Sequence, residues 1–202
     1  MFFFVFRGEI KIKKLLIVGA GGHGRCCLDI AREYYDHIAF LDDNHINNMI
    51  NDCKVIGQID DMRLYCSEYK DIVIAIGNNK LRKQLFNKAV ELGYDLISLI
   101  SNKSIISNYA NIDKGTVVFP NAVIEANVTV GKGCIISTGA IIDHDAVVGD
   151  YCHINALAVV SSMTKITEYT KVDYGQVYRK KDMDETWKEE YVKQFGEEPS
   201  FF

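Results

Sequence analysis

The 202 residues of the chain suffice for one large domain or two small ones. The composition, 48% hydrophobic and 25% charged, is typical of a globular protein, and a net charge of −4 excludes a broadly basic nucleic-acid-binding surface. No apolar run approaches the roughly 20 residues of a membrane-spanning helix, and the apolar residues 1–6 are too few for a signal peptide. We therefore expect a cytoplasmic protein that binds neither nucleic acid nor membrane, with residues 1–6 as an extra strand or an irregular start.

The first half of the chain alternates between apolar runs of strand length and patterns of helical period. Repeated strand–helix–strand units predict a parallel sheet with right-handed crossovers. Residues 44–54 are polar and rich in asparagine, which indicates a loop. The predicted strands are residues 13–18, 38–41, 71–77 and 95–100, and the predicted helices run from the glycine cluster to about 35, over 59–69 and over 79–92.

From Ile100 to Val172 every sixth residue is Ile or Val. A second column, four residues after the first, holds only small or short-branched side chains. A period of six fits neither a helix nor a plain strand, but it suits a triangular coil with one hexad on each face and eighteen residues per turn. The pattern predicts a left-handed parallel β-helix of four coils, in which Cys134 and Cys152 stack as neighbours.

Residues 173–202 break this repeat. Trp187, Tyr191 and Phe195 follow at a spacing of four, which is typical of one helical face. A stack of repeats exposes its core and strand edges at its open end, so a cap is expected there. We predict three parts: a nucleotide-binding α/β domain over residues 1–99, a β-helix over 100–172 and a capping tail over 173–202.

A glycine cluster follows the first predicted strand and opens a helix. Gly19 to Gly24 fit the pattern GxGxxG, which lets a backbone approach a phosphate at a helix N-terminus. Asp42 and Asp43 end the next strand about twenty residues later, where a ribose or a base is held in such folds. The loop alone suggests NAD, but a ninety-residue domain favours a nucleotide diphosphate. An unliganded glycine turn remains the alternative.

A third strand end lies at the same edge of the predicted sheet. Gly77 and Asn78 lead from this strand into a helix, and ligands gather at the carboxyl ends of parallel strands. Arg82, in the first turn of that helix, is either a phosphate contact or an ordinary surface charge.

A possible catalytic group lies within the repeats, at Asp143, His144 and Asp145. His144 is off the inward column, so it points outward. A neighbouring carboxylate fixes the tautomer of an imidazole and raises its basicity, which suits a general base. Asp145 is the better orienting residue, and a solvated polar turn is the alternative. The histidines outside the repeats are dispersed and the six cysteines form no CxxC pair, so we expect reduced thiols and no metal site.

Taken together, these motifs resemble the sialic-acid O-acetyltransferase and nucleotide-aminosugar N-acetyltransferase family. The resemblance covers residues 13 to about 165 and rests on KKLLIVGAGGHG, FLDD, AIGNNKLR and DHDAVVGDYCHI. It implies a Rossmann-like domain before a left-handed β-helix, acetyl-CoA as the acyl donor, and a homotrimer with active sites between subunits.

The resemblance also implies roles for single residues. His144 matches the catalytic base, and Asp145 matches the acidic residue that orients it. The residues expected to hold the sugar nucleotide are Gly21, Gly22, His23, Asp42, Asp43 and Asn78. The residues expected to line acetyl-CoA are His153, Ser137 and Ser162.

One departure from the family concerns the length of the β-helix. Members usually continue the hexads for several coils, which support the pantetheine and adenine of CoA, whereas here the repeat stops near Val172. We expect an acetyltransferase that acts on an amino or hydroxyl group of a sugar in surface-glycan biosynthesis, with a nucleotide-linked sugar favoured. The alternatives are O-acetylation of a sialic-acid-like sugar, a non-catalytic sugar-nucleotide-binding trimer and a small NAD-dependent enzyme.

Overall fold

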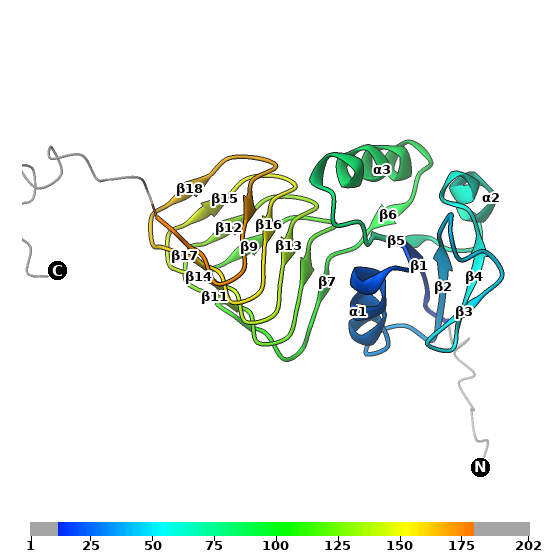
Figure 1. The fold of residues 1–202 in the computed structure, drawn as a ribbon, viewed down its shortest axis with the longest axis horizontal. Coiled ribbons are helices and arrows are strands. Elements are labelled where there is room, and N and C mark those ends of the chain that lie inside the picture. Colours follow the sequence, from blue (N-terminus) through cyan, green and yellow to red (C-terminus); the bar gives the residue numbers. More distant parts are fainter. Residues whose placement is uncertain (1–11, 180–202) are drawn as a thin grey trace, which may run out of the picture.

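A computed structural model describes residues 12–179 of the chain. They form an α/β unit that leads into a long stack of short strands (Figure 1). The strand expected at residues 1–6 and the helix expected around Trp187 lie outside the described residues. Within residues 12–179, no helix is both long enough and apolar enough to cross a membrane.

The N-terminal sheet has six strands in the order β3-β4-β2-β1-β5-β6. Strand β1 (Lys14–Val18) lies between β2 (His37–Leu41) and β5 (Asp71–Ile74) and is parallel to both, as the sequence predicts. Its alternate residues face opposite layers, so Leu15 and Ile17 pack with α1 (Gly22–Ala31), whereas Leu16 and Val18 pack with α3 (Asn79–Glu91). The other elements of this part are β3 (Met49–Ile50), β4 (Cys53–Gly57), the 3₁₀-helix η1 (Ile59–Asp61), α2 (Met62–Tyr65) and β6 (Asp95–Leu96).

Residues 44–54 are not the plain loop that their composition indicates. They contain β3 and the start of β4, which pair as an antiparallel hairpin. Asn51 and Asp52 both have positive φ angles, 44° and 64°, and such turns match the twist of the flanking strands. The Asn-Asp pair is therefore the signal that the sequence interpretation missed. The helix predicted over 59–69 is also shorter, because η1 and α2 together end at Tyr65.

The strand predicted over residues 95–100 is two strands in two different sheets. Strand β6 ends the N-terminal sheet beside β5, whereas β7 (Leu99–Ile100) pairs with β10, eighteen residues further on. The chain therefore passes from one sheet into the other at Ile97 and Ser98.

The second part is a left-handed parallel β-helix, as predicted. Its two-residue strands pair in parallel with the strands eighteen residues before and after them, as in the series Val117, Ile135 and His153. The three walls have the orders β19-β16-β13-β10-β7, β20-β17-β14-β11-β8 and β18-β15-β12-β9, and we call them the first, second and third wall. The strands after β7 are β8 (Ile105–Ile106), β9 (Asn111–Ile112), β10 (Val117–Val118), β11 (Val123–Ile124), β12 (Thr129–Val130), β13 (Ile135–Ile136), β14 (Ile141–Ile142), β15 (Val147–Val148), β16 (His153–Ile154), β17 (Val159–Val160), β18 (Lys165–Ile166), β19 (Lys171–Val172) and β20 (Val177–Tyr178).

Both residue columns of the hexads point into the β-helix. Aliphatic residues such as Ile136 and Ile154 share one buried core with the small residues Ala140, Cys134 and Cys152. The two cysteines are free thiols. The six-residue period is thus explained by side chains that fill a narrow three-walled interior.

The repeat extends one hexad beyond its predicted end at Val172. Strand β20 pairs with β17, which places Tyr178 in register with Val160 and against the same core. The sequence interpretation missed this hexad because it accepted only Ile or Val at the inward position. A larger ring fits here, since no described coil lies beyond it.

The α/β unit packs closely on the first coils of the β-helix, with α1 and α3 facing it (Figure 1). Outward residues of the first wall, Leu99, Val117 and Ile135, share a core with α1. At the corner beside α3, Gly133 has a φ of 62°, and a Cβ there would lie 2.7 Å from the Tyr151 ring. The positive φ and the Tyr151 ring of the next coil therefore require glycine at this position.

Candidate active site

The glycine loop lies at the carboxyl end of β1, with one side packed and the other open. A Cβ on Gly24 would overlap the carbonyl oxygen of Gly19, so Gly24 allows α1 to begin directly against the loop. Gly21 and Gly22 are exposed, and a Cβ on Gly21 would meet no atom within 4 Å. The two glycines predicted to hold a ligand thus leave backbone accessible, at the N-terminus of a helix that favours an anion.

Asp42 ties this loop to the end of β2. Its buried carboxylate accepts hydrogen bonds from the backbone N–H of Ala20 at 2.8 Å and of Asn44 at 2.9 Å, and from Nδ1 of His45 at 2.8 Å. Burial alone would raise the pKa of Asp42, but these hydrogen bonds outweigh it and hold the pKa below its ordinary value. Asp42 thus fixes the glycine loop against the end of β2, and the structure adds His45, which sequence reasoning left among the dispersed histidines.

Asp43 and Asn78 are exposed beyond the ends of β2 and β5, the two strands on either side of β1. One oxygen of Asp43 accepts the backbone N–H of Ile59 at 2.9 Å. The Asn78 side chain caps α3 by accepting the backbone N–H groups of Lys80 and Leu81. Both predicted ligand residues therefore lie at the edge where parallel sheets bind ligands, and both are held by local hydrogen bonds.

Neither prediction for Arg82 is correct. Its side chain is 1% exposed, so it is not a surface charge. Its guanidinium donates only to atoms of the chain, among them the carbonyls of Gly133, Tyr151 and Cys152 in the β-helix. Arg82 therefore bonds the α/β unit to the β-helix.

His23 and His153 come together where these two parts meet. Burial, then the charges of His153 and Arg82, lower the pKa of His23 to about 4. Burial, then Arg82 and Lys171, lower the pKa of His153 to about 4. Nε2 of His153 lies 3.2 Å from Oγ of Ser137 on the same wall. The structure thus joins one predicted sugar-nucleotide residue with two predicted acetyl-CoA residues, and both rings are neutral at pH 7.

His144 lies on the corner that follows β14, with 53% of its side chain exposed. Its Nδ1 lies 2.8 Å from Oδ2 of Asp145, and the other carboxylate oxygen accepts from Nδ2 of Asn127 at 3.0 Å. The hydrogen bond to Asp145, aided by the nearby charges of Asp143 and Glu125, raises the pKa of His144 above its ordinary value. Nε2 remains free to accept a proton, with Oδ1 of Asp143 3.9 Å away.

Within one copy, the predicted site residues form two separate groups. His153 and Ser137 belong to the first wall, beside the α/β unit, whereas His144 follows a strand of the second wall. Ser162 lies with His144, because the next residue, Met163, donates its backbone N–H to the His144 carbonyl at 3.0 Å. No hydrogen bond or ion pair among residues 12–179 joins His144 to His153. In the same part of the chain, no three His, Cys, Asp or Glu side chains are grouped to hold a metal ion.

Comparison with known proteins gives matches over both parts. Residues 14–89 match the PglD N-terminal domain family. The acetyltransferase domain of PglB from Neisseria gonorrhoeae, solved in complex with acetyl coenzyme A, is 35% identical with a TM-score of 0.78, and the alignment covers 82% of each chain.

Two further solved structures are less similar in sequence and support the fold. A mutant of perosamine N-acetyltransferase from Caulobacter crescentus, in complex with CoA and GDP-perosamine, is 24% identical with a TM-score of 0.75, over 83% of this chain and 89% of that one. WeeI from Acinetobacter baumannii is 20% identical with a TM-score of 0.65, over 84% and 90%.

Proposed function

Given that the chain belongs to the nucleotide-aminosugar acetyltransferase family and is an acetyl-CoA-dependent sugar acetyltransferase, we propose that its acceptor is the amino group of a nucleotide-linked sugar in glycan biosynthesis. The observation that carries the proposal is the pairing of His144 with Asp145 on an exposed corner, which leaves Nε2 as a proton acceptor. The related PglB domain binds acetyl coenzyme A, and the perosamine enzyme binds GDP-perosamine with CoA.

In the proposed reaction, Nε2 of His144 accepts a proton from the acceptor amine while the amine nitrogen attacks the thioester carbonyl carbon. A C–N bond forms, the C–S bond breaks, and the leaving thiolate takes up a proton to give the free thiol of CoA. Asp145 accepts from Nδ1 and stabilises the imidazolium formed in this step. The exposed glycine loop and Asp43 hold the nucleotide, so that the sugar extends toward the β-helix.

The active site of this proposal forms between copies of the chain in a homotrimer. Within one copy the base lies on the second wall and His153 on the first, so only a neighbouring copy brings His144 to the nucleotide. The outward residues of the second wall form an aliphatic column whose members are exposed or half-buried in one copy. Its members are Ile105, Val123, Ile141, Val159 and Val177. An apolar strip of this length favours burial against another subunit.

Acetyl-CoA is proposed to lie in the groove that this contact creates, with its acetyl group between His153 and the neighbour's base. The Ser137 hydroxyl and the Ser162 corner lie on the two sides of such a groove. The extra hexad ending at Tyr178 lengthens the wall available to the donor beyond what the sequence interpretation gave it.

The direct test is the substitution His144→Ala, assayed with acetyl-CoA and a panel of UDP-, GDP- and CMP-linked amino sugars. A positioned general base typically contributes about 10²–10⁴-fold, so turnover is expected to fall by that factor. Calorimetry is expected to give unchanged affinities for acetyl-CoA and for the nucleotide sugar. Full turnover in the variant would rule out His144 as the base, and transfer to hydroxyl acceptors alone would replace the amine with an oxygen nucleophile.

A further inference from the structure

Arg82 is a buried cation whose hydrogen bonds go only to uncharged acceptors. Its Nε donates to the Gly133 carbonyl at 2.7 Å, and Nη2 donates to Oδ1 of Asn79 at 2.8 Å and to the carbonyls of Tyr151 at 2.9 Å and Cys152 at 3.2 Å. Its Nη1 donates to the carbonyls of Ile76 at 2.9 Å and Gly77 at 3.2 Å. Among the described contacts of its guanidinium there is no carboxylate.

Burying a guanidinium without a carboxylate partner costs folding free energy, which suggests that the group has a specific role. Burial disfavours the charged form and lowers the pKa of Arg82 to about 10, which still leaves it protonated at neutral pH. A solvated arginine on the surface of α3 would avoid this cost. The planar fork, however, presents five N–H donors at fixed angles, which a lysine cannot do.

The acceptors belong to the two parts that border the proposed site. Ile76 and Gly77 form the loop after β5, at the ligand edge of the N-terminal sheet. Gly133, Tyr151 and Cys152 belong to two successive coils, and Cys152 directly precedes His153. The Gly77 backbone also lies near the His153 ring and favours its protonated form, so the loop and the ring are neighbours at this contact.

We propose that Arg82 is a positioning residue for acetyl transfer, whose guanidinium fixes the 76–78 loop against the β-helix wall that carries His153. It thereby sets the distance between the nucleotide, at the ligand edge of the N-terminal sheet, and the acetyl group beside His153. This inference rests on the proposed function, because that function puts the nucleotide on one side of the contact and the acetyl group on the other.

The charge of Arg82 has a second, measurable consequence. The charged or titratable groups that act on His153 are Arg82 from α3, His23 from α1 and Lys171 from β19. Those around His23 are His153, Arg82 and the Cys27 thiol, whose sulfur is 3.9 Å from Nε2. The Arg82 charge opposes protonation of both rings, so both are kept as neutral hydrogen-bonding groups.

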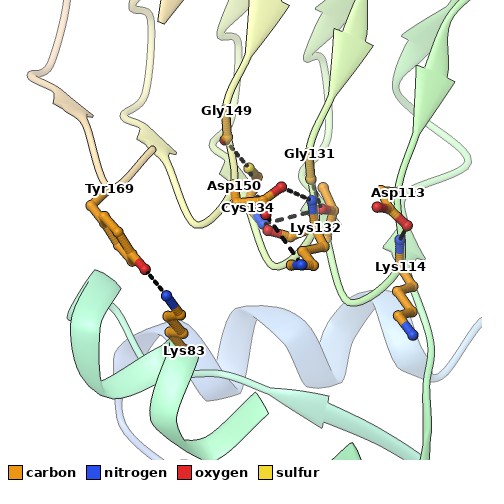
Figure 2. Close-up of polar contacts among 10 residues, drawn as sticks. Lys83, Asp113, Lys114, Gly131, Lys132, Cys134, Gly149, Asp150 and Tyr169 are labelled. Carbon is orange, nitrogen blue, oxygen red and sulfur yellow. Dashed lines mark hydrogen bonds and ion pairs between the residues drawn. The ribbon is translucent and has the colours of Figure 1, made fainter. Parts of the chain in front are cut away.

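The test compares Arg82→Gln, Arg82→Lys and the control Lys83→Gln. Lys83 is the next residue of α3, but it is half-buried, and its ammonium contacts the Tyr169 hydroxyl instead of the acceptors of Arg82 (Figure 2). Its substitution removes the same charge from the same helix without touching the Arg82 contacts. The readouts are the pH titrations of His23 and His153 by NMR, assigned with His→Gln variants and recorded without ligand, and kcat and KM for transfer.

In Arg82→Gln the two imidazole pKa values are expected to rise by about one pH unit, because a like charge nearby has been removed. In Arg82→Lys they are expected to stay close to the wild-type values. Both variants are expected to lower kcat by about 10–100-fold, because misplacement of reacting groups by about 1 Å has effects of this size. Lys83→Gln is expected to change neither readout.

The proposal is overturned if folded Arg82→Gln titrates like the wild type, or if Arg82→Lys keeps the wild-type kcat. If Arg82→Gln does not fold, Asn79→Ala serves in its place, because it removes one acceptor of the guanidinium. An unchanged kcat in both Asn79→Ala and Arg82→Lys would then also overturn the proposal. The NMR titrations require no turnover, so they separate this inference from failure of the proposed function. Loss of the base in His144→Ala is expected to lower turnover but to leave the titrations of His23 and His153 unchanged.

Discussion

Nδ1 of His144 and Oδ2 of Asp145 lie 2.8 Å apart although the two residues are adjacent in the chain. Such a contact is possible here because Asp145 adopts a left-handed backbone with φ of 59°, at a corner of the β-helix. Asparagine and aspartate tolerate this conformation better than most residues. The corner therefore readily accepts the residue type that also orients the proposed base.

Asp145→Asn keeps the backbone preference at this corner and removes the charge. The hydrogen bond to Asp145 raises the pKa of His144, so its loss is expected to move the acidic limb of the kcat/KM profile to lower pH. The plateau is expected to fall by about 10–100-fold, because a weaker base with an unfixed tautomer accepts the proton less well. The measurement is the pH dependence of transfer, with Asp143→Asn as the comparison. A larger effect in Asp143→Asn would make Asp143 the orienting residue.

The glycine loop offers a pair of substitutions that separate ligand approach from folding. Gly21→Ala places a methyl group where no atom lies within 4 Å, so thermal stability is expected to stay close to the wild-type value while KM for the nucleotide sugar rises. Gly24→Ala forces a methyl group into the Gly19 carbonyl, and overpacking of this kind costs at least about 1–3 kcal/mol of folding free energy. Thermal denaturation and steady-state kinetics distinguish the two. Unchanged KM in Gly21→Ala would remove this part of the loop from the nucleotide site.

Mixing two inactive variants tests whether the proposed site is shared between copies. His144→Ala and His153→Ala subunits, unfolded together and refolded at equal amounts, are expected to regain activity that neither has alone. If each site takes one histidine from each of two neighbours, random assortment in a closed ring of three restores about a quarter of the sites. A mixture as inactive as its components, in trimers confirmed by light scattering, would place both histidines of a site in one copy. Ile141→Lys provides a further control, since a charge on the aliphatic column is expected to prevent assembly.

The depressed pKa of His153 makes a prediction for stability against pH. The unfolded chain binds a proton at this residue below its ordinary value of 6.5, whereas the folded chain does so only near 4. The stability of the wild type relative to His153→Gln is therefore expected to fall as the pH decreases from 6.5 to about 4. The contribution of His144 to stability changes with pH in the opposite direction, because its pKa is raised in the folded state. The wild type is therefore expected to gain stability relative to His144→Gln as the pH falls. Denaturant titrations at several pH values measure both differences, and equal slopes for the two variants would contradict them.

Local sequence determined the β-helix, the glycine loop and the paired base, because each depends on residues that are close together in the chain. The six-residue column from Ile100 to Val172 specifies the β-helix, since only a narrow three-walled interior demands that period. The pattern Gly19–Gly24 after an apolar run gave the loop at the ligand edge, and the adjacent His144 and Asp145 gave the paired base, because neighbours in the chain are neighbours in space.

Tertiary packing decided what depends on contacts between distant segments. No local pattern distinguishes the buried Arg82 from a surface arginine, because its acceptors Gly133, Tyr151 and Cys152 lie 51 to 70 residues away. Likewise, His144 and His153 are nine residues apart and look like one constellation, yet a coil with three faces puts them on different walls. The sequence period fixes which side chains point outward, but only the folded coil determines which of them share a wall.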